Sequence, residues 1–153
     1  MDTRAKINVA LKEAMKEKDQ RRLSTLRLVN AAIKDREIAL RGTSEDHAID
    51  DKDVMQIIGK MVKQRHESAR AYEEGGRLEL AEQELAEVKV LEHFLPRQLT
   101  EAEVSAAIEA AVTKLNASSI RDMGRVMGEL KAKYTGRMDF TTVGGRVKER
   151  LSA

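Results

Sequence analysis

The chain contains no cysteine, and this absence excludes disulfide scaffolds, thiolate metal sites and cysteine nucleophiles. The same absence suits a reducing compartment. Only one proline occurs in 153 residues. Because proline interrupts helix interiors and is common in turns, its scarcity predicts long helices with few breaks.

Aromatic residues make up only 3% of the chain, and tryptophan is absent. Readers of single-stranded nucleic acid usually stack bases on several aromatic rings, so the shortage argues against that class of protein. The four aromatic side chains are scattered along the sequence: Tyr72, Phe94, Tyr134 and Phe140.

Long apolar runs are also missing. No segment approaches the length of about 18 consecutive apolar residues that a transmembrane helix needs. The first residues lead into a charged amphipathic stretch and not into an apolar leader. We therefore expect a cytoplasmic protein that does not contact membranes.

Charge is abundant but unevenly distributed. Lys and Arg number 28 and Asp and Glu 26, so the net charge is only +2. By segment the balance is +5 for residues 1–41, −6 for residues 42–96 and +3 for residues 97–153. Anionic partners are therefore expected at the two ends of the chain and not at its middle.

Hydrophobic residues recur with helical spacing nearly throughout, which predicts an all-α protein. We expect a four-helix N-terminal part over residues 1–96, followed by a compact three-helix subdomain over residues 97–153. The predicted helices cover about residues 3–18, 19–41, 50–74, 78–95, 101–115, 119–134 and 139–151.

Local signals mark the ends of several of these helices. Thr100 and Glu103 have the spacing of a capping box. Gly42 suits the position after a helix C-cap, where a left-handed backbone is common. Ser118 or Ser119 and then Asp139 suit the N-caps of the last two helices. Pro96 is expected to stop the fourth helix, because the residue before a proline is pushed out of the helical conformation.

No arrangement of residues predicts a catalytic, metal or cofactor site. The three histidines, His47, His66 and His93, lack the spacing of a helical metal-binding pair. No glycine-rich phosphate-binding loop is found. An acidic group precedes the third helix, and it fits a helix N-terminus better than a calcium loop. Its members are Glu45, Asp46, Asp50, Asp51 and Asp53.

A basic stripe runs along the second predicted helix. A solvated helix face explains it, and so does a surface for an anionic partner. The stripe consists of Arg21, Arg22, Arg27, Lys34, Arg36 and Arg41.

Two glycines lie four residues apart inside the sixth predicted helix, at Gly124 and Gly128. Each costs the helix about 1 kcal/mol relative to alanine, so a larger side chain should obstruct something. One explanation is close packing of a neighbouring helix. The other is close approach of a nucleic-acid backbone, held by phosphate contacts. The candidate RNA-binding residues are Arg121, Gly124, Arg125, Gly128, Lys131, Lys133, Arg146 and Lys148.

Several ordered motifs resemble the YqeY-like proteins. Residues 26–34, LRLVNAAIK, are similar to their N-terminal signature. Residues 92–100, EHFLPRQLT, resemble their hinge motif, although His93-Phe94 stands where tyrosine is common. Residues 122–127, DMGRVM, and residues 147–151, VKERL, complete a resemblance that extends over essentially the whole chain.

The resemblance implies an all-α pair of subdomains related to the tail of the B subunit of tRNA-dependent amidotransferase. Such tails hold the outer corner of tRNA and carry no active site. The resemblance thus implies a non-catalytic tRNA-binding accessory module. A protein-interaction adaptor that docks on an aminoacyl-tRNA synthetase or amidotransferase is the alternative. The family also carries the label of a carbon–nitrogen ligase with glutamine as amido donor, for which the sequence offers neither an amidase nucleophile nor an ATP loop.

Overall fold

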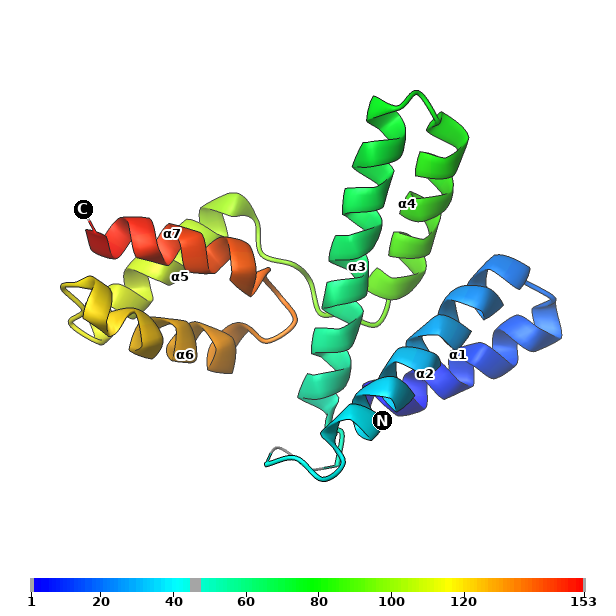
Figure 1. The fold of residues 1–153 in the computed structure, drawn as a ribbon, viewed down its shortest axis with the longest axis horizontal. Coiled ribbons are helices and arrows are strands. Elements are labelled where there is room, and N and C mark those ends of the chain that lie inside the picture. Colours follow the sequence, from blue (N-terminus) through cyan, green and yellow to red (C-terminus); the bar gives the residue numbers. More distant parts are fainter. Residues whose placement is uncertain (1, 45–47, 153) are drawn as a thin grey trace. The chain divides into compact units, whose positions relative to one another are not determined.

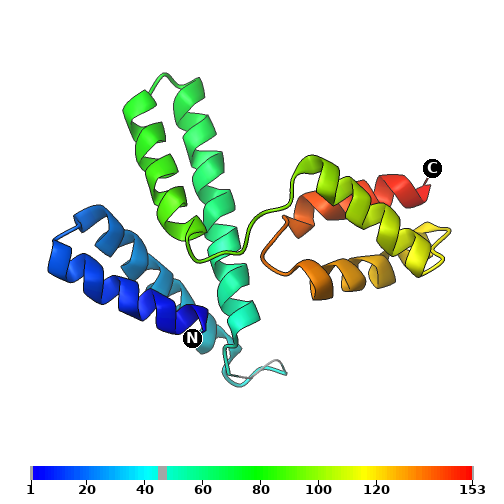
Figure 2. The same ribbon diagram turned by 180° about the vertical axis from the view of Figure 1, so that it is seen from behind.

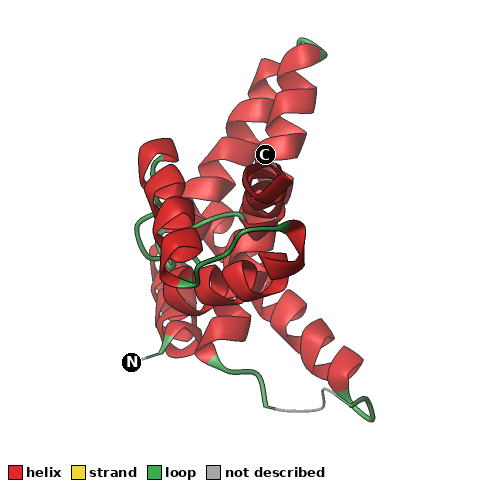
Figure 3. Cartoon of the chain, turned by 90° about the vertical axis from the view of Figure 1, so that its left-hand side faces the viewer, coloured by secondary structure: helices red, strands yellow, loops and turns green. Residues whose placement is uncertain are grey.

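The computed structural model describes residues 2–44 and 48–152, and within them it contains helices, turns and loops but no strand (Figure 3). The expected all-α class and the order of helices are therefore confirmed. The chain divides into two compact units, Met1–Leu95 and Pro96–Ala153. None of the described helices is both long enough and apolar enough to cross a membrane.

The first unit contains two helical hairpins, α1 with α2 and α3 with α4 (Figures 1 and 2). The first hairpin turns at Lys18, whose backbone is left-handed with φ of 55°, and the second turns at Gly75 and Gly76. The helices span Thr3–Glu17 (α1), Gln20–Leu40 (α2), Asp51–Glu74 (α3) and Leu78–Glu92 (α4).

One apolar core joins the four helices of this unit. Each helix contributes from the stripe that its spacing places on one side, including Ile7, Leu26, Ile58 and Leu91, all fully buried. A polar contact ties two helix starts together, because the Thr3 amide donates to Asp51 Oδ1 at 2.7 Å. The hydrogen bond from the Thr3 side chain, followed by that from the Thr3 amide, lowers the pKa of Asp51.

The second unit is a three-helix bundle with its own core. Its buried residues include Val104, Ile108, Val126, Leu130 and Val147. A short 3₁₀ turn, η1, spans Ile120–Asp122 and leads directly into the middle helix, a feature that the periodicity did not predict. The α-helices span Glu101–Lys114 (α5), Met123–Tyr134 (α6) and Phe140–Ser152 (α7).

Most of the expected helix ends are confirmed. Thr100 and Glu103 form the predicted capping box, and Gly42 follows the C-cap of α2 with φ of 72°. The predicted end of α4 at Leu95 is wrong, and the helix stops at Glu92. The amides of Phe94 and Leu95 bond three residues back, to Leu91 and Glu92, so the chain tightens into a turn before Pro96.

The segment that follows Pro96 is held by the loop between α6 and α7. Gln98 Nε2 donates to the Gly136 carbonyl at 2.6 Å, and the Leu99 amide donates to the Arg137 carbonyl at 2.9 Å. Arg97 pairs with both oxygens of Glu103 at 2.8 Å. The segment between Pro96 and α5 is thereby tied both to the first turn of α5 and to the loop between α6 and α7.

The Arg97–Glu103 pair makes the stability of the second unit depend on pH. The hydrogen bond from Arg97, followed by that of the Thr100 amide, lowers the pKa of Glu103 from 4.5 to about 2. Because the pKa is lower in the folded state, the stabilisation is complete above pH 4.5 and disappears as the pH falls towards 2.

The variant Glu103→Gln preserves the helix cap. In thermal unfolding it should show a stability deficit relative to the wild type near pH 7, and this deficit should vanish near pH 2. Arg97→Gln should reproduce this behaviour, and a deficit that does not change with pH would contradict it.

Candidate nucleic-acid interface

The orientation of α6 is set by its apolar side. Val126 is 0% exposed and Leu130 is 1% exposed, and Met123 and Met127 pack partly buried against the same core. On a helix that turns about 100° per residue, this leaves Gly124 and Gly128 on the opposite side. Both glycines are exposed.

Among the described residues of the second unit, nothing outside their own helix lies close to the Cβ positions of the two glycines. A Cβ added at Gly124 or at Gly128 would meet no atom within 4 Å outside the helix's own backbone. Neither residue has a positive φ, so the backbone does not require glycine there. Close packing of a neighbouring helix, one of the two explanations that the sequence left open, is therefore wrong.

Ala132 extends this smooth surface. It lies four residues after Gly128 and is exposed, so Gly124, Gly128 and Ala132 form one column of small residues along the outer side of α6. Ala132 is not among the residues predicted from the sequence, although its spacing from the glycines was a sufficient signal. We call this column the small-residue face.

Unpaired cations flank the small-residue face. Lys131 lies seven residues after Gly124 and three after Gly128, which places it beside both. Arg121 in η1 lies at the N-terminal end of α6 and is exposed. Neither side chain has an ion pair or a hydrogen bond within the described part of the chain, so both charges are available to a ligand.

Arg125 has a structural contact as well as an exposed surface. Its Nη2 donates to the Leu115 carbonyl at 2.9 Å and to Asp122 Oδ1 at 3.1 Å, joining the end of α5 to the start of α6. The amides of Ser118 and Ser119 also donate to Asp122 and are the main cause of its lowered pKa. The Arg125 side chain remains 56% exposed, at the edge of the small-residue face.

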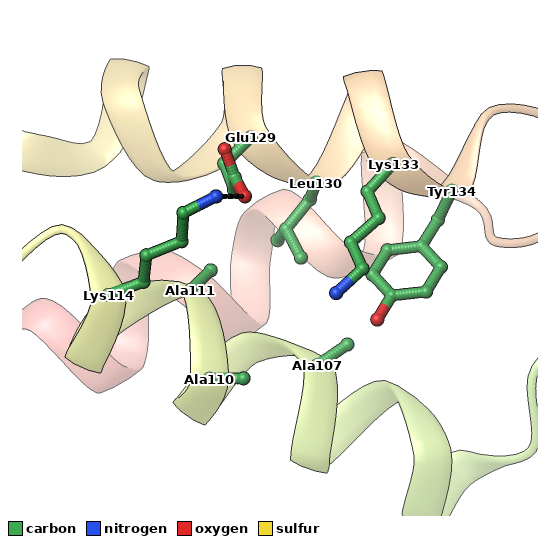
Figure 4. A pocket seen from close by; sticks show the side chains of 8 residues that line it. All are labelled: Ala107, Ala110, Ala111, Lys114, Glu129, Leu130, Lys133 and Tyr134. Carbon is green, nitrogen blue, oxygen red and sulfur yellow. Dashed lines mark hydrogen bonds and ion pairs between the residues drawn. The ribbon is translucent and has the colours of Figure 1, made fainter.

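Lys133 points towards α5 instead of towards the glycines. It is nine residues from Gly124, about half a turn around the helix. Its Nζ lies 5.5 Å from the centre of the Tyr134 ring, over the alanines of α5 (Figure 4). The small pocket there has a volume of about 40 Å³, enough for little more than a water molecule.

The two candidate residues of α7 point to different sides. Arg146 Nη1 pairs with Glu101 Oε2 at 3.2 Å, and its Nη2 donates to Ser105, so Arg146 faces α5. Lys148 lies four residues after Gly144, whose Cβ position faces Met123 and Met127 of α6. Lys148 is exposed and is thereby placed on the α6 side of α7.

Five of the eight sequence-predicted residues lie together on η1 and α6, around the small-residue face: Arg121, Gly124, Arg125, Gly128 and Lys131. Lys148 lies on the side of α7 that faces α6. Lys133 and Arg146 lie on the sides that face α5.

The residues weighed as metal ligands have other roles where the structure describes them. His66 is exposed, and His93 packs edge-on against Phe94 with ring centres 5.3 Å apart. Asp50 and Asp53 form the capping box of α3, the role expected of acids at a helix start. No group of three potential ligands occurs in residues 2–44 and 48–152. Outside the described residues lie His47, Glu45 and Asp46.

The N-terminal basic stripe does not form a single surface. Arg22 pairs with Glu13 and Glu17 of α1, each at 3.4 Å. Arg27 and Lys34 instead share the exposed side of α2, and Arg41 is the exposed C-cap of that helix.

Comparison with known proteins matches residues 4–151 to the family model of YqeY-like proteins. Three curated relatives share the name altered inheritance of mitochondria protein 41, mitochondrial. The one from Kluyveromyces lactis is 31% identical over 100% of this chain and 78% of its own length. Those from Lachancea thermotolerans and Pyrenophora tritici-repentis are 28% and 26% identical, over 78% and 97% of this chain and 63% and 80% of their own lengths.

These names contradict the expected cytoplasmic location, because they describe mitochondrial proteins. The expectation rested on the absence of cysteine and of long apolar runs. Those features are compatible with any reducing environment and do not identify one compartment.

The open surroundings of Gly124 and Gly128 predict that alanine stabilises the fold at both positions. Gly124→Ala and Gly128→Ala should each raise the free energy of unfolding by about 1 kcal/mol, because alanine costs less backbone entropy and meets no obstacle. Chemical denaturation measures the change. Gly136→Ala is the control and should destabilise, because Gly136 has φ of 76°. Destabilisation by either helical substitution would show that the glycine serves the fold.

Proposed function

The chain belongs to the YqeY-like protein family, and we propose that it is a non-catalytic module that holds folded tRNA through the small-residue face of α6. The uncovered glycine pair carries the proposal. Two glycines cost the helix about 2 kcal/mol in all, and neither packing nor backbone geometry requires them. A surface that must admit another backbone closely accounts for the cost.

Electrostatics supports a phosphate ligand. Arg121, Lys131 and Lys148 are exposed and lack ion pairs among the described residues, while Arg125 keeps part of its guanidinium in solvent. The acids of η1 and α6 are already engaged, because Asp122 accepts the amides of Ser118 and Ser119 and Glu129 pairs with Lys114 at 2.7 Å. Cations beside bare helix backbone suit contacts to phosphate and ribose, which do not depend on base sequence.

The aromatic residues of the second unit support recognition of shape over recognition of bases. Tyr134 and Phe140 pack against the core that contains Leu130 and Val143. Rings held in this way cannot serve as open platforms for bases. Folded RNA, whose phosphates form a fixed surface, is the ligand that fits.

The non-catalytic part of the proposal is supported by the roles of the perturbed carboxyl groups. Enzymes shift pKa values at the residues that move protons. Here the lowered pKa values of Asp51 and Asp122 follow from hydrogen bonds at helix starts, and the lowered pKa of Glu103 follows first from its hydrogen bond with Arg97 and then from the Thr100 amide. Each of these groups is held ionised and engaged, which suits a scaffold and not an acid or base.

Bulk on the small-residue face should separate RNA binding from stability. Gly124→Leu with Gly128→Leu should weaken tRNA binding about tenfold or more, because the side chains hold the phosphate backbone away. The same variant should be at least as stable as the wild type, because leucine favours helix more than glycine does. Filter binding with bulk tRNA at low salt and chemical denaturation give the two readings. The double alanine variant is the size control and should bind more tightly than the leucine variant.

Charge reversal should change the salt dependence of binding. For the wild type, log K should fall linearly with log salt concentration, because phosphate contacts release counterions. Arg121→Glu with Lys131→Glu should weaken binding and reduce that slope. Lys12→Glu with Lys16→Glu alters two exposed residues of α1 by the same total charge and is the control. Unchanged affinity in the first variant, or a wild-type Kd weaker than roughly 10⁻⁴ M at low salt, would contradict the proposal.

A further inference from the structure

A second exposed surface lies on α2, in the other unit, and the proposed RNA function does not use it. The buried side of this helix carries Leu26, Val29 and Ile33. Leu28 and Ile38 lie outside it and are 47% and 50% exposed. A helix with apolar residues on two sides is normally covered on both, yet no described residue covers the second side.

The exposed residues form a regular seam. Ser24, Leu28, Ala31, Asp35 and Ile38 follow one another at spacings of four, three, four and three, and all five are exposed. This alternation is the repeat by which one helix packs along another in a coiled coil. We call these five residues the α2 seam.

One side of the α2 seam is lined by positive charge. Arg27 and Lys34 are one heptad apart on α2, next to the seam, and both are exposed. Arg41 is the exposed C-cap of the helix and adds a third positive charge at its end. Their side chains make no ion pair with any described residue. In coiled coils the positions beside the seam select the partner through interhelical ion pairs. Two cations along the helix and a third at its end therefore favour a helix with acidic residues one heptad apart.

The same charges disfavour a second copy of this chain. A parallel pair of α2 helices would place Asp35 against Asp35 of the other copy within the seam, and an antiparallel pair would place the basic column against itself. RNA is disfavoured as well, because Leu28 and Ile38 occupy the seam and offer nothing to phosphate. A different protein, with opposite charge, satisfies both constraints.

We propose that the α2 seam docks an amphipathic helix of another protein. That helix carries aliphatic residues with the same alternating spacing, Asp or Glu facing Arg27 and Lys34, and Lys or Arg facing Asp35. The surface lies in the first unit, so the inference is independent of RNA binding by α6.

Two synthetic helical peptides of about three heptads test the proposal on the full chain. Both carry leucine along the seam and a lysine placed to face Asp35. One carries glutamate along the flank and the other carries lysine. Isothermal titration should show the acidic peptide binding about tenfold or more tightly than the basic one. Amide shifts in NMR spectra should fall within residues 20–41 of the labelled protein.

Variants separate selection by charge from nonspecific hydrophobic binding. Arg27→Glu with Lys34→Glu should reverse the preference between the two peptides. Lys12→Glu with Lys16→Glu makes the same change in net charge elsewhere and should leave the preference intact. Leu28→Asp with Ile38→Asp should abolish binding of the acidic peptide while circular dichroism confirms the fold, since both side chains are already half exposed.

Three results would overturn the proposal. The first is equal affinity of the wild type for the two peptides. The second is a dimer in sedimentation that Leu28→Asp dissociates, which would make a second copy the occupant. The third is tRNA shifting the amides of residues 20–41, which would make the surface an RNA contact. None of these depends on whether α6 binds RNA.

Discussion

Burial of Val126 and Leu130 is the interaction on which the candidate surface depends. These two side chains fix the rotation of α6 about its own axis, and every other residue of the helix follows from that rotation. Gly124 and Gly128 are consequently turned to solvent. A rotation of the helix by even one residue would bury a glycine and expose a core side chain at considerable cost. The exposed glycine face is thus held in place by the same core that stabilises the unit.

The many charges of the chain divide into two groups with different roles. One group is consumed by the fold: Arg97 holds Glu103, Arg150 holds Glu109 at 2.6 Å, and Asp122 caps a helix start. The other group, which includes Lys131 and Arg27, finds no partner in the described structure. Unpaired cations lie beside the small-residue face of α6 in one unit and beside the α2 seam in the other. Both surfaces are therefore positively charged. The glycines of the small-residue face suit contact with a polar backbone, whereas the apolar residues of the α2 seam suit a protein helix.

Helix positions were predictable because their signals act within one turn. The capping box at Thr100 and the left-handed Gly42 are examples. The end of α4 was not, because the tightened turn before Pro96 depends on backbone bonds that compete with the helix. The openness around Gly124 could not be read from spacing, since it requires the positions of α5 and α7.

The side chains of the candidate site were only partly predictable. Lys131 follows from its spacing to Gly128, and the spacing of Lys133 already pointed the other way. Arg146 could not be assigned, because its position is determined by Glu101 and Ser105, 45 and 41 residues away in sequence. Long cationic side chains select partners on other helices, and a single sequence does not reveal which ones.

The most direct test of the account is a map of the tRNA contact on the free chain. In an NMR titration of the labelled protein with bulk tRNA at low salt, we expect amide shifts at Gly124, Gly128 and Lys131 that diminish as salt is added. Shifts confined to other helices, or none at protein concentrations near 10⁻⁴ M, would contradict the claim that the uncovered glycine face of α6 exists to admit an RNA backbone.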